Sequence, residues 1–159
     1  MQRHLRRALI TLAGMTASAG AWAAVTVTYI DSEKMTDVPR FATERSAMEI
    51  EFREHLEQLG AKLPPEQNLA IEILDIDLAG DVFPKVAIRD VRVMKGMADW
   101  PRIKLRYRLE QNGQLLRSGE QELADPNYQM SINSYRNEMY GYEKQMLDDW
   151  FKKDLLVTK

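Results

Sequence analysis

The sequence contains no cysteine and only two histidines in 159 residues. Without cysteine the chain forms neither a disulfide nor a thiolate metal site, and it has no thiol for lipid attachment. Its stability must therefore come from a packed core. His55 is the only histidine after the first 23 residues, which excludes a metal site built from several imidazoles.

Recognisable catalytic motifs are also missing. No Gly-x-Ser-x-Gly segment is present, so the nucleophile turn of the common hydrolases is absent. His55 lies in a helical pattern beside Glu54 and Glu57, where a lone histidine is expected at the surface or rim of the helix. We therefore assign no catalytic residues, no metal and no cofactor, and lean towards a protein that is not an enzyme.

The chain has no concentrated run of basic side chains. It carries 22 Lys and Arg against 24 Asp and Glu, a formal charge of -2. Loss of the first 23 residues would remove Arg3, Arg6 and Arg7 and leave 19 basic side chains, a formal charge of -5. Nucleic acids are bound mainly through clustered Lys and Arg, so no nucleic-acid partner is expected.

One uncharged segment stands out, from Ala8 to Gly20, directly after the three arginines. Together with the small residues of Ala21-Trp22-Ala23, this pattern is typical of a secretory signal peptide. The segment is too short and too rich in Thr, Ser and Gly for a retained membrane helix. We predict a signal peptide over residues 1–23, cleaved after Ala23 or, alternatively, after Ala24. We also predict a single soluble domain over 24–159 in the periplasm of a Gram-negative bacterium, with no membrane span.

Several segments of the exported part alternate apolar and polar residues as strands do. They are Val25–Tyr29, Leu69–Leu78, Val86–Val93, Ile103–Leu109 and Leu115–Leu123. The apolar phase of the second segment slips by one residue, which predicts a β-bulge near Leu74 and Asp75. Asn112-Gly113 is the preferred dipeptide of a tight turn, so the last two segments are predicted to form an antiparallel hairpin.

Two segments have the three-and-four spacing of amphipathic helices. The first is predicted from Ser46 to near Lys62, with Ser46 and Glu49 as a capping box. Its apolar stripe is Met48, Phe52, Leu56, Leu59 and Leu63. The second is predicted from the stripe Tyr135, Met139, Tyr142, Met146 and Trp150, ending at Lys152 and Lys153. The order of elements predicts an α+β fold, an antiparallel sheet of about four to five strands with two amphipathic helices packed on one face.

The candidate acidic site is Asp75 and Asp77, two residues apart on one strand and so on one side of it. Paired carboxylates can exchange protons or bind a hard cation. The structural alternative is a solvated strand face. Met94 and Met97 offer thioethers to a soft metal, but methionine also fills gaps in cores, and we assign no metal to them.

The candidate binding surface is formed by Arg102, Arg106 and Arg108, together with Tyr140. The three arginines lie on the solvent-facing side of the strand predicted over Ile103–Leu109, Arg102 directly before it. Tyrosine and arginine are frequent at binding hot spots. Tyr140 and Arg136 fit the core stripe of the second helix least well. The alternative is that the aromatic residues simply close the core.

Short segments spread over the exported part resemble a known family. They are Leu63-Pro64-Pro65, Asp75-Ile76-Asp77-Leu78-Ala79-Gly80, Pro101-Arg102-Ile103, Gly119-Glu120 with Leu123 and Asp125, and Tyr142-Glu143-Lys144 with Leu147 and Asp149-Trp150-Phe151. In their order they resemble the exported proteobacterial proteins classed as domain of unknown function (DUF) family 3016. The resemblance implies an exported soluble domain and carries no activity or site residue with it.

Three hypotheses follow from the residues. The leading one is a non-enzymatic accessory protein that binds an envelope protein or glycan through Arg102, Arg106 and Arg108 or the C-terminal helix. The second is a cation-binding protein or enzyme centred on Asp75 and Asp77. The third is a binder of a small ligand or lipid, which requires a sizeable apolar cavity. The oligomeric state, ligand and pathway stay open.

Overall fold

The computed structural model describes residues 23–83, 91–96 and 98–156 of the chain. In chain order its elements are β1 (Ala24–Tyr29), the 3-10 turn η1 (Ser32–Lys34), α1 (Ala42–Gly60), β2 (Gln67–Asp77), β3 (Asp81–Phe83), β4 (Val91–Val93), β5 (Arg102–Gln111), β6 (Gln114–Ala124), α2 (Gly141–Phe151) and the π-helical turn η2 (Lys152–Leu156). All of the predicted signal peptide except Ala23 lies outside the described residues.

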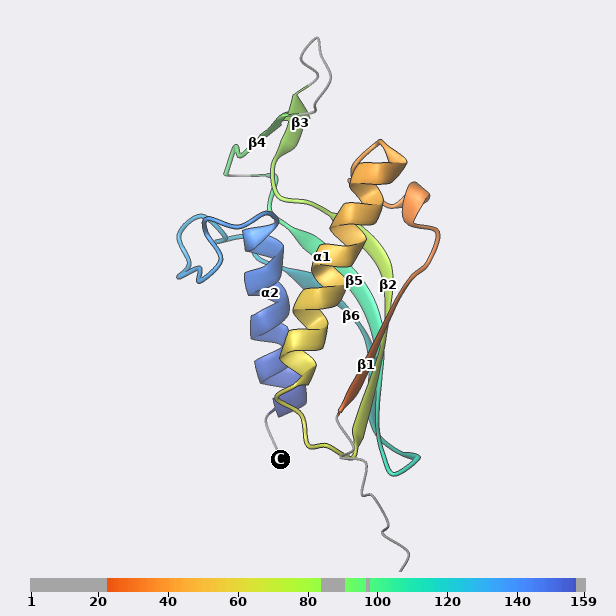
Figure 1. The fold of residues 1–159 in the computed structure, drawn as a ribbon. Coiled ribbons are helices and arrows are strands. Elements are labelled where there is room, and N and C mark those ends of the chain that lie inside the picture. Colours follow the sequence, from red (N-terminus) through yellow and green to blue (C-terminus); the bar gives the residue numbers. More distant parts are fainter. Residues whose placement is uncertain (1–22, 84–90, 97, 157–159) are drawn as a thin grey trace, which may run out of the picture.

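The main sheet has four strands in the order β1-β2-β5-β6, and both helices lie on the same side of it (Figure 1). The strands β2, β5 and β6 are antiparallel, whereas β1 pairs with β2 in parallel, from Ala24 opposite Asn68 to Tyr29 opposite Ile73. The prediction of an antiparallel sheet is therefore wrong for β1. The physical reason is α1, which carries the chain back along the sheet so that β2 runs in the direction of β1.

The core lies between this sheet and the two helices. Alternate residues of β2 and β5 face the helices because side chains of a strand point to opposite faces in turn. The predicted apolar stripe of α1 is buried against them. The buried core comprises Val27, Met48, Phe52, Leu56, Leu59, Leu63, Leu69, Ile71, Ile73, Ile76, Ile103, Leu105, Tyr107, Leu109, Met146, Leu147, Trp150 and Phe151, with Met35, Leu78 and Leu155 at its ends.

Two local predictions about the strands are confirmed. The pairing of β2 with β5 shifts register between Ile73 and Asp75, which is the predicted bulge. Asn112 and Gly113 have φ angles of 51° and 78° and join β5 to β6 in the predicted hairpin. Both residues tolerate the positive φ that this two-residue turn requires.

A separate two-stranded hairpin, β3 with β4, projects beyond the end of the main sheet (Figure 1). Of the strand predicted over Val86–Val93, the described part, Val91–Val93, forms β4, and it pairs with β3 and not with the main sheet. Residues 86–90 lie outside the described part of the chain. Gly80 begins this departure with a φ of 79°, and a Cβ there would lie 2.7 Å from the Val93 carbonyl oxygen.

The first helix begins earlier than predicted. It starts at Ala42, and its N-cap residue, Phe41, makes no side-chain capping hydrogen bond. Ser46 lies inside the helix, so the predicted capping box with Glu49 is wrong. The box pattern is short enough to occur within a helix, and here residues ahead of it continue the helical backbone.

The second helix is shorter than predicted, because the stripe from Tyr135 does not begin it. Residues 127–140 form turns, Met139 is 62% exposed, and α2 starts at Gly141 after Tyr140, which has a φ of 55°. A Cβ on Gly141 would lie 2.0 Å from the Tyr135 carbonyl oxygen. The turn segment folds back onto the helix so closely that only glycine fits there.

The faces of α2 also differ from a simple amphipathic pattern. Besides its apolar residues, it buries Glu143, Lys144, Gln145 and Asp148. The last three contact α1 or the 127–140 segment, whereas Glu143 contacts Ala79 after β2. The fold is thus α+β, with a mixed sheet, a small extra hairpin and two helices. None of the described helices is both long and apolar enough to cross a membrane.

Candidate ligand pocket

The two predicted site carboxylates lie on β2 just after the bulge, and each has a partner in the fold. Asp75 accepts hydrogen bonds from the Thr36 backbone N–H and hydroxyl, both at 2.7 Å. Asp77 accepts from Arg102 Nη1 at 2.8 Å, and burial raises the pKa of its carboxyl. These contacts attach the segment after η1 and the start of β5 to β2.

The predicted arginine surface lies on the face of the sheet that the helices leave open. Arg106 pairs with Glu72 at 2.8 Å and with Glu120 at 3.0 Å, and Arg108 pairs with Glu110. Together with the pair between Arg102 and Asp77, every arginine of the predicted surface has a carboxylate beside it. The surface therefore carries paired positive and negative side chains and is not a basic patch.

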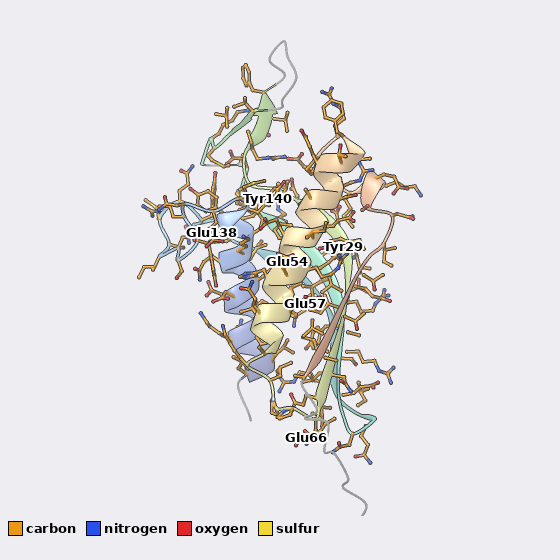
Figure 2. The ribbon with its side chains drawn as sticks, viewed as in Figure 1. Tyr29, Glu54, Glu57, Glu66, Glu138 and Tyr140 are labelled. Atoms are coloured by element: carbon orange, nitrogen blue, oxygen red, sulfur yellow. The ribbon has the colours of Figure 1, made fainter. Side chains whose placement is uncertain are left out.

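Tyr140, the remaining predicted residue, lies between the beginning of α2 and α1 (Figure 2). Its ring meets the edge of Phe52 with centroids 5.3 Å apart, and burial raises the pKa of its hydroxyl. Tyr140 therefore takes part in the core, but one side of it lines a pocket. Arg136 is exposed at the rim of the same pocket.

This pocket, of about 660 Å³, lies where the first half of α1, the β2–β3 corner, β4 and the beginning of α2 meet. Apolar and aromatic side chains supply most of its wall. The apolar and aromatic lining residues are Pro39, Ala47, Leu78, Ala79, Val82, Met94, Met139, Tyr140, Gly141 and Tyr142. A concave, mostly apolar space of this size with a few polar groups is typical of small-molecule sites.

The polar group set deepest in the wall is the carboxyl of Glu143, in the first turn of α2. The residue is only 2% exposed, and its Oε1 accepts the Ala79 backbone N–H at 2.7 Å. Burial raises the pKa of this carboxyl. Among the described residues no basic side chain forms a hydrogen bond or ion pair with it. The charge of Arg92 lowers the pKa of the carboxyl, but burial outweighs it.

Arg92 of β4 is the cation that acts electrostatically on this carboxyl, but its guanidinium is already engaged. It donates to both carboxylate oxygens of Asp37, at 2.5 and 3.1 Å, and to the Gly80 carbonyl at 2.6 Å. Longer bonds reach the carbonyls of Leu78 and Ala79. The five contacts attach the β3–β4 hairpin to the end of β2 and form one wall of the pocket.

His55 is buried, at 5% exposure, so the prediction of a surface or rim position is wrong. Its Nε2 lies 3.1 Å from the Lys144 carbonyl oxygen and 3.7 Å from Asp148, and the ring of Tyr135 packs edge-on over it. Burial lowers the pKa of the imidazole. Tyr135, from which the second helix was predicted to begin, supplies the covering ring.

No three histidine, aspartate or glutamate side chains of the described part of the chain gather as a metal site requires. Met94 lines the pocket and is 38% exposed, while Met97 lies outside the described residues. Any site shared by the two methionines therefore lies outside the described residues.

Glu143 and Arg92 were missed by the sequence analysis, although one signal for Glu143 was present. Glu143 lies three, four and seven residues before Met146, Leu147 and Trp150, so it occupies the apolar stripe of its helix. A charged residue in such a stripe indicates a buried polar group with a special role. No comparable signal identified Arg92, whose partners come from distant parts of the chain.

Comparison with known proteins gives one family. A family model described as "Protein of unknown function (DUF3016)" matches residues 23–153. No curated protein and no solved structure matches the chain.

Proposed function

The chain belongs to this family of proteins of unknown function, and we propose that it is an exported, non-enzymatic binding protein of the periplasm whose small ligand occupies the pocket beside Glu143. The observation that carries the proposal is the pocket itself. It has about 660 Å³ of space, a largely apolar and aromatic wall, and a deeply buried carboxyl to which no basic side chain of the described residues donates a hydrogen bond. Such a combination favours an amphiphilic small molecule over a macromolecular surface.

The other candidate surfaces support the proposal less well. A protein or glycan that used Arg106 and Arg108 would have to share them with Glu72, Glu120 and Glu110. Charges that are already paired and exposed contribute little to affinity. The carboxylates of Asp75 and Asp77 likewise hold other parts of the fold, which favours a structural role for them.

Export is proposed from the pattern of the first 23 residues, a basic start followed by an uncharged segment and small residues at 21 and 23. Cell fractionation of the tagged full chain, with N-terminal sequencing of the recovered protein, tests it. We expect a periplasmic protein beginning at Ala24, or at Val25 for the alternative cut. A cytoplasmic chain that retains Met1 would contradict this part of the proposal.

Ligand binding is tested with a neutral apolar fluorophore, N-phenyl-1-naphthylamine, and a variant that fills the pocket. Ala47 lines the pocket from an exposed position on α1, so Ala47→Trp blocks the space without changing the core. The matched control is Ala70→Trp, at an exposed position on the open face of β2. We expect saturable fluorescence enhancement with the unchanged protein and with Ala70→Trp, and its loss with Ala47→Trp. Enhancement that is absent throughout, or equal in both variants, would refute a binding pocket at this place.

A further inference from the structure

The buried carboxyl of Glu143 has an unusual charge environment. A carboxylate removed from water is strongly disfavoured unless a cation accompanies it. Glu143 is 2% exposed and receives the Ala79 N–H, a neutral donor. Burial accordingly raises the pKa of this carboxyl, so the free protein holds its proton to a higher pH than an exposed glutamate would.

Two basic side chains near Glu143 are committed elsewhere. Arg92 pairs with Asp37 through two hydrogen bonds and with three backbone carbonyls. Lys144, the next residue along α2, binds Glu51 at 3.0 Å and Glu138 at 2.9 Å. In the described part of the chain neither cation forms an ion pair with Glu143, and the charge of Arg92 only partly offsets the effect of burial on the pKa of Glu143.

The remaining charged groups of the pocket wall are at its rim. Glu44 comes from α1, and Arg136 and Glu138 come from the segment before α2. Arg136 and Glu138 are exposed to water, where their influence on a buried site is screened. Tyr140 and Tyr142 add aromatic surface to the wall, and aromatic faces attract cations.

We infer that the pocket accepts an organic cation, an ammonium group carried on an apolar body, with the nitrogen paired to the Glu143 carboxylate and the body against Leu78, Met94 and Tyr140. The inference rests on the proposed function, since it assigns the chemical class of the ligand of the same pocket. An ammonium ion there supplies the counter-ion that Arg92 and Lys144 do not. The described wall offers an anion only Arg92, which is paired with Asp37, and the exposed Arg136.

Binding of this kind exchanges one proton. The protonated Glu143 carboxyl releases its proton to solvent, and the ligand ammonium keeps its own three, so one proton leaves for each ligand bound. Affinity for the cation therefore increases as pH rises above the ordinary range of a glutamate and levels off once Glu143 is ionised in the free protein. The affinity for a neutral ligand with the same apolar body either falls as pH rises or does not depend on pH.

The test uses three probes with the same eight-carbon chain, octylamine, octanol and octanoate. Their affinities for the full exported protein are measured by calorimetry at pH 5 to 8, in two buffers that differ in ionisation enthalpy so that proton release is counted. We expect octylamine to bind about tenfold more tightly than octanol at pH 8, the size of a charge-assisted hydrogen bond, and octanoate to bind most weakly. Equal affinities, tightest binding of octanoate, or octylamine binding without proton release at every pH measured would overturn the inference.

Glu143→Gln provides the matched variant because it keeps the shape and the acceptor oxygen but cannot ionise. It should lose the preference for octylamine while still binding octanol and N-phenyl-1-naphthylamine, and Glu44→Gln at the rim should retain the preference. If Glu143→Gln keeps the preference, the assignment of Glu143 is wrong. Should Glu143→Gln fail to fold, the pH dependence and proton release of the unchanged protein still decide. Binding of neutral probes without any preference for the amine contradicts this inference alone, whereas no binding of any probe contradicts the proposed function.

Discussion

The stability of the free protein should depend on pH through Glu143, and Glu143→Gln should remove that dependence. The folded state holds the proton of Glu143 more tightly than the unfolded chain, because burial raises the pKa of the carboxyl from its ordinary value of 4.5. The stabilising contribution is therefore fully present below pH 4.5 and is lost as pH rises through the higher pKa of the folded state. Glutamine has no such proton, so its contribution stays constant.

The size of the effect follows from two opposing contributions. An ionised carboxylate removed from water without a basic partner is destabilised by several kcal/mol. The hydrogen bond from the Ala79 N–H, at 2.7 Å, returns about 1.5–3 kcal/mol to a charged acceptor. We therefore expect Glu143→Gln to gain about 2 kcal/mol of unfolding free energy relative to the unchanged protein between pH 4 and pH 8.

Urea unfolding followed by tryptophan fluorescence measures this difference at each pH. Taking the difference between the two proteins cancels the titration of all other groups, including Asp99 and Asp148, whose pKa values are lowered in the fold. The control is Glu57→Gln, at an exposed position on α1 (Figure 2), which should change little at any pH. A difference between Glu143→Gln and the unchanged protein that is flat from pH 4 to pH 8 would refute the reasoning, since Glu143 would then have a counter-ion.

Three further outcomes are expected. Gly141→Ala should lower the unfolding free energy by about 3 kcal/mol, because its Cβ would meet the Tyr135 carbonyl oxygen. Gly113→Ala, with a φ of 78° and open space around it, should lower it by only about 1 kcal/mol. Equal losses in urea unfolding would contradict this. The His55 imidazole should titrate below 6.5 in NMR spectra, because burial lowers its pKa. Its titration therefore lowers the unfolding free energy as pH falls below 6.5. A value above 6.5 would mean that the attraction of Asp148 outweighs burial. Arg92→Lys, which cannot reproduce the forked contacts, should speed amide exchange in β3 roughly tenfold by hydrogen-exchange mass spectrometry, and unchanged exchange would show that the guanidinium does not hold the hairpin.

Local features of this chain could be predicted from sequence wherever neighbouring residues decide them. Asn112-Gly113 supplies the two positive φ angles of its turn, and no distant contact is needed for that choice. The bulge at Asp75 is visible because the apolar phase of β2 changes, and a strand with one buried face must restore its phase. The apolar stripe of α1 could also be predicted from residue spacing, since every predicted member of it is buried.

Predictions failed where distant contacts outweighed local preference. The helical spacing from Tyr135 continues without a break into α2, yet close packing of the Tyr135 backbone against Gly141 and the positive φ of Tyr140 place the helix start at residue 141. His55 has the sequence surroundings of a surface residue, but the ring of Tyr135 covers it. Periodicity cannot report which segment will cover a helix face.

The same contrast between features set along the chain and features set by distant contacts applies to function. The sequence by itself determined the absence of thiol chemistry, the modest charge, the predicted export and most of the strands and core stripes, because these depend on composition and on spacing along the chain. Only the tertiary structure decided that β1 runs parallel to β2, that the sheet arginines have carboxylate partners, and that Glu143 is buried beside a pocket while Arg92 is bound to Asp37. Those features join residues up to 64 positions apart, and such pairings arise from the packing of whole elements, which a pattern of neighbouring residues does not encode.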